Sequence, residues 1–300
     1  MPLNEEFELL ADLEDDVVRL MEAHKERRKD WYFHELVPWE RGESFADKPW
    51  DESQATVAPE VRTALVLNLL TEDNLPYYHE VIGRFMPNGS AFKAWNNLWT
   101  AEEGQHAIAI RSYLLTSRNC DPDELEDDRK QTMTNGYEPP WDSPAELFAY
   151  TSAQELATRI SHRNTGKLTD DPAAFELMKK IAQDENHHFL FYRGMMSAIL
   201  REAPSIGIQA IHRVLTNFEM PGTSMPRFLR RSIEVAKAGV YNLRVHHDNV
   251  LAPLLREWQI GDVLGLTPKA QELQEQLMAL PEQILQQAER FERRLGIQPA

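Results

Sequence analysis

Trp99-Thr100-Ala101-Glu102-Glu103-Gly104-Gln105-His106 and Asp184-Glu185-Asn186-His187-His188 each contain the pattern Glu-x-x-His, and these two stretches decide which fold we expect. On an α-helix, residues three positions apart lie on one face, so the Glu and the His of each motif can reach the same partner. One such match is weak, because the chain is rich in acidic residues and also contains ten histidines. The surroundings of the two motifs make the pair more specific.

Both motifs lie on the apolar faces of expected helices. Glu103 is within two helical turns of Trp99 and Ile110, and Glu185 is one turn from Ile181. Helical periodicity directs these apolar neighbours toward a core. Ionised carboxylates are almost never buried without a positive partner, because removing them from water is costly. The two motifs therefore predict a buried cationic group.

A single carboxylate on an apolar helix face precedes each motif. Glu72 precedes Glu103 by 31 residues, and Glu155 precedes Glu185 by 30. The chain thus repeats Glu and then Glu-x-x-His, one group on each of four helices, which is the ligand arrangement of ferritin-like di-iron and di-manganese bundles. The candidate metal ligands are Glu72, Glu103, His106, Glu155, Glu185 and His188.

The chemistry of this ligand set favours two iron or manganese ions. Four carboxylates balance the charge of two divalent ions, and oxygen-rich ligands with histidine and no thiolate suit Fe or Mn better than copper(I) or a structural zinc site. The alternative is a polar network whose members satisfy one another without a metal.

A further pair of acidic residues can hold the two histidines in place. Glu102 and Asp184 each directly precede a candidate ligand. In a two-fold symmetric bundle, Asp184 can accept the free imidazole N–H of His106, and Glu102 that of His188. The alternative is that both are ordinary charges on a helix surface.

Helix signals organise the chain into one domain of residues 1–300. We expect an amphipathic helix over 1–30, an irregular connection over 31–58, and a four-helix core over about 59–203. The C-terminal part, 204–300, adds further helices. The expected helices cover about 59–86, 90–117, a segment starting at Ser143-Pro144, 171–202, short pieces over 205–260, and 267–295. No alternating segment is long enough for a sheet, so the fold class is all-α: a ferritin-like di-iron four-helix bundle core with additional helices.

Composition excludes several classes of protein. A formal net charge of −16 argues against general nucleic-acid binding, which relies on Lys and Arg. No apolar run approaches the roughly 18–20 residues that a membrane-spanning helix needs. The acidic N-terminus lacks the layout of a secretory signal, and the single cysteine, Cys120, cannot form an intramolecular disulfide. We therefore expect a cytoplasmic protein without a transmembrane segment.

Over about residues 10–260, the chain resembles the soluble acyl-carrier-protein desaturases, in particular actinobacterial members related to the plastid stearoyl enzymes. The resemblance rests on segments in matching order and spacing: Thr71-Glu72-Asp73-Asn74-Leu75-Pro76, Trp99-Thr100-Ala101-Glu102-Glu103, Gln154-Glu155-Leu156-Ala157-Thr158 with Ile160-Ser161-His162, and Asp184-Glu185-Asn186-His187-His188.

What the resemblance implies is a di-iron, O₂-dependent oxidoreductase that removes two hydrogens from an acyl chain carried on acyl carrier protein. It also implies reduced ferredoxin as electron donor and a homodimer. The six candidate ligands would bind two iron ions, with Glu103 and Glu185 bridging. Thr158 matches a threonine beside the O₂ site, and Trp31 matches a tryptophan on a suspected electron route through Asp184 and His106. A buried structural role for Trp31 stays open.

The chain departs from the family at one motif. Members often read Glu-Glu-Asn-Arg-His, whereas this chain reads Glu102-Glu103-Gly104-Gln105-His106. The ligands remain, but a glycine inside a helix costs roughly 1 kcal/mol relative to alanine, and a positive charge is lost. We expect iron binding to remain, and electron delivery, partner docking or full activity to be the properties that this change affects.

Acyl carrier protein is acidic, so we expect a basic docking surface. Arg227, Arg230 and Arg231 form one candidate, and the basic cluster over 25–29 forms the other. We expect an apolar tunnel beside the metal site. Its candidate wall residues are Leu69, Leu75, Phe148, Met195 and Met196.

The leading hypothesis is a desaturase that inserts a cis double bond. Two alternatives stay open: a di-iron acyl hydroxylase, and an inactive family member that binds iron or acyl carrier protein. The sequence specifies neither the acyl chain length nor the position of the double bond.

Overall fold

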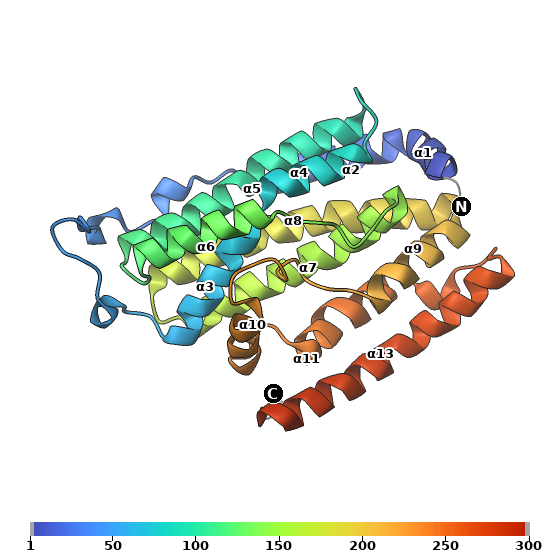
Figure 1. Ribbon diagram of the computed structural model, residues 1–300. Helices are drawn as coiled ribbons and strands as arrows, with labels where there is room; N and C mark the ends of the chain where they lie inside the picture. The colour runs from blue at the N-terminus through green and yellow to red at the C-terminus, as the bar shows by residue number, and fades with distance from the viewer. Residues whose placement is uncertain (1–2, 298–300) are drawn as a thin grey trace.

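The computed structural model describes residues 3–297, and this part of the chain is helical without any strand (Figure 1). Four long helices form the centre of the molecule. They are α3 (Pro59–Glu72), α5 (Ala91–Thr116), α7 (Pro144–Leu168) and α8 (Pro172–Glu202). Both α3 and α8 pack against α5 and α7, so the four helices close into a bundle. The predicted all-α four-helix fold class is confirmed.

Capping side chains fix the starts of the long helices. Ser143 Oγ accepts a hydrogen bond of 3.3 Å from the backbone N–H of Glu146, and Asp171 Oδ1 accepts one of 2.9 Å from Ala173. A proline follows each cap, where its missing N–H leaves no hydrogen bond unmade. The predicted starts at 143 and 171 are confirmed. The same device at Thr267 starts α13 (Pro268–Leu295).

Two predicted helices are each divided in the structure. The expected helix over 1–30 forms α1 (Leu3–Asp12) and α2 (Glu14–Arg27), with the chain turning at the fully buried Leu13. The expected helix over 59–86 ends at Glu72 and resumes as α4 (Leu75–Arg84). Pro76 explains the second break, because a proline ring clashes with the carbonyl four residues earlier and lacks an N–H.

One helix was missed by the sequence interpretation. Residues Pro122–Asn135 form α6, which begins after Asp121. The Asp121 carboxylate accepts hydrogen bonds from the backbone N–H groups of Asp123 and Glu124 at 2.9 and 3.2 Å. The local signal, an acidic cap followed by proline, was therefore the same as at 171.

The remaining elements surround the bundle. α2 packs against α5 and α8, α9 (Pro204–Thr216) against α7 and α8, and α10 (Phe228–Lys237) against α3. α13 lies along α9 at the outer edge of the molecule (Figure 1). The list is completed by α11 (Leu243–His246), a π-helical turn (His247–Leu251) and α12 (Ala252–Glu257), with single 3₁₀ turns at Phe33–Glu35, Trp39–Arg41, Glu52–Gln54 and Ile260–Asp262. Residues 28–58 are otherwise irregular, as predicted.

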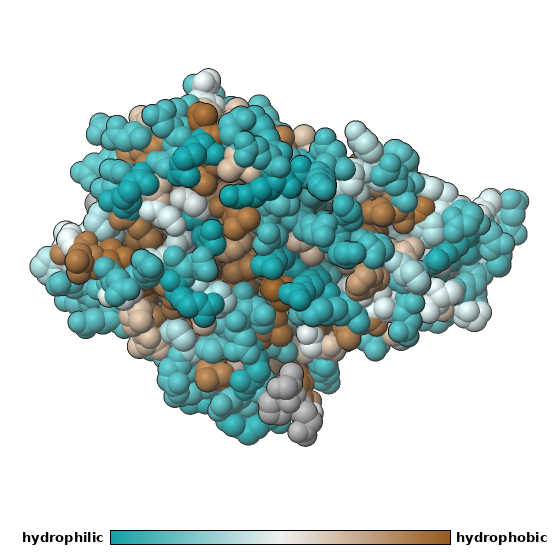
Figure 2. All heavy atoms as spheres, turned by 180° about the vertical axis from the view of Figure 1, so that it is seen from behind, coloured by the Kyte–Doolittle hydropathy of each residue, from teal (hydrophilic) through white to brown (hydrophobic). Residues whose placement is uncertain are grey.

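The apolar core lies within and beside the bundle. Trp95, Phe148 and Tyr192 are almost fully buried in its largest cluster. The face shown in Figure 2 is mostly hydrophilic, with apolar side chains in separate groups. Among the described helices, none has the length and apolar character needed to cross a membrane.

Candidate metal centre

The six predicted ligands meet inside the four-helix bundle. Each of the four central helices contributes one carboxylate, and α5 and α8 each add one histidine. All six side chains are buried, and none is more than 7% exposed. Their relative exposures are Glu72 7%, Glu103 5%, His106 0%, Glu155 1%, Glu185 1% and His188 0%.

The ligand atoms form two groups that share two members. Within each group, the donor atoms lie within 4.8 Å of one another. One group contains Glu72 and His106, the other contains Glu155 and His188, and both include Glu103 and Glu185. This arrangement offers two adjacent metal positions with Glu103 and Glu185 between them.

The two histidines are held with one nitrogen facing inward. His106 Nε2 lies 3.3 Å from Asp184 Oδ2, and His188 Nε2 lies 2.9 Å from Glu102 Oε2. The Nδ1 atoms point to the carboxylates of the centre, at 2.9 Å and 2.7 Å from Glu103 respectively. Both predicted contacts are therefore present. The alternative, ordinary surface charge, is wrong because Glu102 and Asp184 are 7% and 3% exposed.

Burial and mutual repulsion oppose ionisation of the carboxylates in this cluster. Burial, and then Glu103 and Glu185, raise the pKa of Glu72 well above its ordinary value. Burial also raises the pKa of Glu155, with Glu185 as the next cause. Carboxylates in such a cluster cannot all ionise without nearby cations. The four together match the charge of two divalent ions.

Unsatisfied buried atoms test whether the residues fit such ions. Within the described residues, His106 Nδ1, His188 Nδ1 and Glu155 Oε2 are buried without a partner in hydrogen-bond geometry, although the two nitrogens lie 2.9 and 2.7 Å from Glu103 oxygens. Buried polar atoms are ordinarily paired. These three atoms all belong to the centre, where a bound metal ion would satisfy them, and the oxygen-rich donor set with histidine suits Fe or Mn.

Thr158 lies at the edge of the centre. Its hydroxyl donates a hydrogen bond of 2.8 Å to Glu185 Oε2, in addition to contacts with backbone carbonyls of α7. It also lines a cavity of about 190 Å³ that reaches Glu72. The residue is therefore placed between a shared carboxylate and an open space.

Trp31 contacts the network on the His106 side. Its indole Nε1 donates a hydrogen bond of 2.8 Å to Asp184 Oδ2, and its ring stacks on that of His106 with centroids 6.3 Å apart. Trp31 is also part of a buried apolar cluster. The contact with Asp184 matches the prediction, while an electron-transfer role for Trp31 stays a prediction.

The sequence interpretation gave no role to two histidines beside the centre. His162 Nε2 lies 3.0 Å from Glu72 Oε1, and His24 Nε2 lies 3.0 and 3.1 Å from the two carboxylate oxygens of Glu102. Burial lowers the pKa of His162 to about 4, so this ring is neutral near pH 7. His162 is one turn from Thr158 on α7, a spacing that could have revealed it. His24 gave no such local signal.

The predicted docking arginines are mostly paired with acidic side chains. Arg227 pairs with Glu124 and Asp128, and Arg231 also pairs with Asp128. Arg230 contacts Glu234 at 3.0 Å and has a side chain 78% exposed. All three arginines line a surface cleft of about 670 Å³ that also contains acidic residues. This surface therefore carries charges of both signs.

The second docking candidate, the cluster over 25–29, is divided. Arg28 has a side chain only 7% exposed and is directed toward Glu102 and Asp184. Its guanidinium is therefore part of the buried network and is not available to a docked protein. Lys25, Arg27 and Lys29 are exposed.

The residues expected as tunnel walls stay a prediction: four of them are buried in the core, and Leu75 is partly buried beside it. None of the five lines either cavity beside the centre. The first cavity, of about 190 Å³, is lined by polar groups near Glu72 and by apolar groups of α10 and the preceding loop. These are Leu67, Asn68, Thr71, Glu72, Thr158, Ser161, His162, Met220, Pro221, Phe228, Ser232, Val235 and Tyr241.

A second, narrower space shares one lining residue, Pro221, with the first. It passes Trp99, whose indole N–H donates to Glu155 Oε1 at 3.1 Å, and is otherwise lined mainly by aromatic and aliphatic side chains. The first cavity therefore reaches Glu72, and the second is lined by Trp99, which contacts Glu155. The helical periodicity of the sequence could not distinguish residues of the packed core from residues that line a cavity.

Comparisons with known proteins agree with this site and fold. A model of the fatty acid desaturase family matches residues 5–300. DesA1 of Mycobacterium tuberculosis, assigned as an acyl-[acyl-carrier-protein] desaturase, is 38% identical over 298 residues, covering 96% of this chain and 88% of the relative. Palmitoyl-[acyl-carrier-protein] 4-desaturase 2 of Ophrys sphegodes is 30% identical, and the match covers 81% of this chain and 69% of that relative.

A crystal structure gives the same result for the fold. DesA2 of Mycobacterium tuberculosis H37Rv, also assigned as an acyl-ACP desaturase, superposes with a TM-score of 0.73 at 25% sequence identity. The match covers 88% of this chain and 98% of that one. The predicted resemblance is confirmed: the chain belongs to the fatty acid desaturase family, among its acyl-[acyl-carrier-protein] desaturases.

Proposed function

We propose that this protein is an O₂-dependent di-iron desaturase that inserts a cis double bond into an acyl chain carried on acyl carrier protein. The observation that carries the proposal is the position of two Glu/His ligand groups, with two shared carboxylates, beside an apolar cavity. The relatives named as acyl-ACP desaturases support this substrate class.

The reaction removes one hydrogen from each of two neighbouring methylenes. Together with O₂, two electrons and two protons, the two hydrogens leave as two molecules of water. Two iron ions, when bound, supply the oxidising power that an unactivated methylene requires. Glu72, Glu103, His106, Glu155, Glu185 and His188 would hold the ions.

The surrounding residues would position the ligands and exclude water. Asp184 and Glu102 orient the two imidazoles through their Nε2 atoms. Thr158 holds Glu185 and borders the cavity. Apolar walls around the chain keep water away from the reacting methylenes, which prevents side reactions.

Helix α10 supports a docking site for the carrier protein. Phe228, Ser232 and Val235 line the cavity that reaches Glu72, while Arg230 and its neighbours on the same helix line the outer cleft. A carrier bound at Arg227, Arg230 and Arg231 would therefore hold its acyl chain next to the cavity. Ferredoxin as electron donor, a homodimeric assembly and a cytoplasmic location are part of the proposal.

The test is mass spectrometry of the acyl chain after iron-loaded protein is incubated with acyl-ACP, reduced ferredoxin and O₂. We expect a loss of two hydrogens that is abolished in Glu103→Ala and His188→Ala and retained in Glu282→Gln, an exposed control on α13. Gain of one oxygen would instead identify a hydroxylase. An unchanged chain over a range of lengths, with two irons bound, would identify an inactive binder.

A further inference from the structure

One guanidinium outside the bundle contacts both carboxylates that orient the histidines. Arg28 follows the last residue of α2, and its side chain is 7% exposed. Its Nε lies 3.3 Å from Glu102 Oε2, and its Nη2 lies 3.2 Å from Asp184 Oδ2. Glu102 belongs to α5 and Asp184 to α8. Arg28 therefore connects the two halves of the centre without contacting a ligand.

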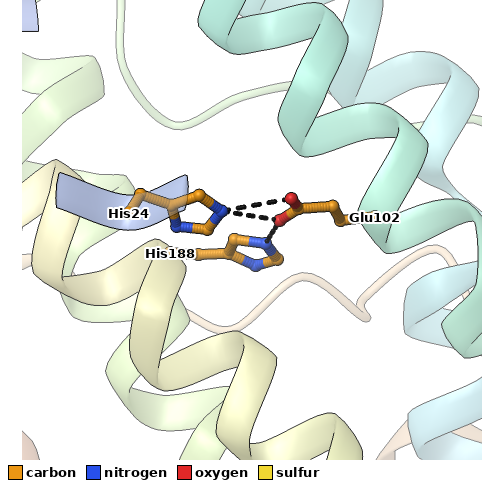
Figure 3. A group of neighbouring side chains, drawn as sticks. All are labelled: His24, Glu102 and His188. Carbon is orange, nitrogen blue, oxygen red and sulfur yellow. Dashed lines mark hydrogen bonds and ion pairs between the residues drawn. The ribbon is translucent and has the colours of Figure 1, made fainter. Parts of the chain in front are cut away.

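Each carboxylate also has partners of its own. His24 and His188 both place Nε2 against the Glu102 carboxylate, at 3.0 and 2.9 Å from Oε2 (Figure 3). These are hydrogen-bond distances, so the three groups form a network. Figure 3 shows His24 entering from α2, opposite the ribbon that carries Glu102.

Asp184 has an equivalent set of partners. Its Oδ2 accepts a hydrogen bond of 2.8 Å from Trp31 Nε1 and lies 3.3 Å from His106 Nε2. His24 therefore contacts the carboxylate that orients His188, and Trp31 contacts the one that orients His106. Among the described residues, Arg28 is the one that contacts both carboxylates. A third acidic residue, Asp30, also contacts this guanidinium. Its Oδ1 lies 2.6 Å from Arg28 Nη1, and its side chain is exposed.

Two buried carboxylates held near one another require a cation. Glu102 and Asp184 are each less than 10% exposed, and removing one partner of a buried ion pair leaves an uncompensated charge. Without Arg28, both carboxylates could turn away from the imidazoles. This change would release the Nε2 contacts that direct the inward Nδ1 atoms.

We propose that Arg28 is a positioning residue that fixes Glu102 and Asp184 together, and thereby prepares both metal positions at once. His24 and Trp31 each act on one position only. The inference rests on the proposed function, because it assumes that the two Glu/His groups bind metal. It goes beyond that proposal in assigning a joint control of the two positions to one residue, Arg28, directly after α2.

The experiment is a titration of metal-free, full-length protein with Co²⁺ under anaerobic conditions, followed by the ligand-field absorption bands and by the stoichiometry. The wild-type protein should bind two ions per chain. If it binds none, the proposed centre itself fails, which is distinct from a failure of the inference. Circular dichroism of each metal-free variant checks that it is folded.

Three variants remove the contacts while retaining bulk. Arg28→Met should weaken binding of both ions by about 10- to 100-fold, the usual effect of losing a partner behind a metal ligand, and should shift both sets of bands. His24→Phe and Trp31→Phe should each weaken one ion only. Arg27→Met, an exposed neighbour on the same helix, should match the wild-type protein.

Arg28→Lys keeps the charge but has a single ammonium in place of the guanidinium fork. This variant should give an intermediate loss of metal affinity at both positions. It replaces Arg28→Met in the test if Arg28→Met does not fold. Unchanged affinities and bands in the folded Arg28 variants, or the loss of one ion only, would overturn the inference.

Discussion

Thr158 and Glu185 lie on adjacent helices, and the Thr158 hydroxyl donates a hydrogen bond of 2.8 Å to Glu185 Oε2. Glu185 belongs to both ligand groups. The bond therefore fixes one of the two shared carboxylates from the side that faces the cavity. Among the described residues, no other hydroxyl donates a hydrogen bond to a candidate ligand carboxylate.

We expect Thr158→Val to lower the turnover number about tenfold with two ions still bound. The replacement keeps the shape of the side chain but removes a hydrogen bond to a charged group, which contributes roughly 1.5–3 kcal/mol. Thr158→Ser should retain most activity. Steady-state kinetics and metal analysis check this, and a Val variant with full turnover would contradict it.

The number of metal ions that a variant binds should depend on which of the two ligand groups the replaced residue belongs to. Glu103 belongs to both groups, so Glu103→Ala should lose both ions, whereas Glu72→Ala and Glu155→Ala should each retain one. The measurement is the metal-to-protein ratio by elemental analysis after loading with Fe²⁺ and desalting. Glu176→Gln, on the exposed surface of α8, is the control and should retain two. Equal losses in all three ligand variants would contradict the shared role of Glu103.

Gly104→Ala should stabilise the protein by about 1 kcal/mol. An added Cβ would meet only Leu75 Cδ2, at an ordinary 3.9 Å, and alanine is favoured over glycine inside a helix. Gly207→Ala on α9 is the contrast, because its Cβ would lie 2.7 Å from Leu200 Cδ2 and 3.3 Å from backbone. Urea unfolding of both variants should give free-energy changes of opposite sign.

Acid should destabilise the fold partly through His246. Burial, and then His247, lower the pKa of this histidine to about 4, compared with 6.5 for an exposed one. Below about pH 6.5 the unfolded chain takes up a proton that the folded chain does not. Stability is therefore lost as the pH falls toward 4, by up to about 1.4 kcal/mol per pH unit.

His246→Gln should remove this part of the pH dependence. Glutamine stays neutral and can still contact Tyr241, whose hydroxyl lies 2.9 Å from His246 Nδ1. Unfolding free energies measured by urea at several pH values between 7.5 and 4.5 should give a shallower slope for the variant. Parallel curves for the two proteins would show that His246 does not contribute.

Arg230→Glu should raise the KM for acyl-ACP about tenfold with little change in kcat. Arg230 is the most exposed of the three α10 arginines, and replacing it reverses a charge at the entrance to the cleft. Electrostatic attraction to an acidic carrier weakens with salt, so the difference should shrink as ionic strength rises. Arg290→Glu, exposed on α13, should leave the KM unchanged.

Local features allowed much of the bundle to be predicted from the sequence. The cap-and-proline pairs at 143, 171 and 267 act within four residues, so they specify helix starts before any packing occurs. The i, i+3 spacing of Glu and His fixes their common face in the same way. The missed α6 carries the same kind of signal, so that helix could have been predicted.

Other elements depend on how distant segments pack. The break at Leu13 has no proline or glycine to announce it, and it allows Leu10, Leu13 and Val17 to be buried together. The five apolar residues predicted as tunnel walls follow the helical period. The period places side chains toward the interior, but it does not separate a filled core from the border of a cavity.

The sequence by itself determined the fold class and the six candidate ligands, because helix period, caps and repeated motifs are encoded within a few neighbouring residues. Only the tertiary structure decided that His24 and Arg28 also lie beside that centre. His24 contacts Glu102 across 78 positions of the chain, and Arg28 reaches Asp184 across 156. Such pairs depend on the rotation and depth at which α2 packs against α5 and α8, and burial then makes each of those polar contacts necessary.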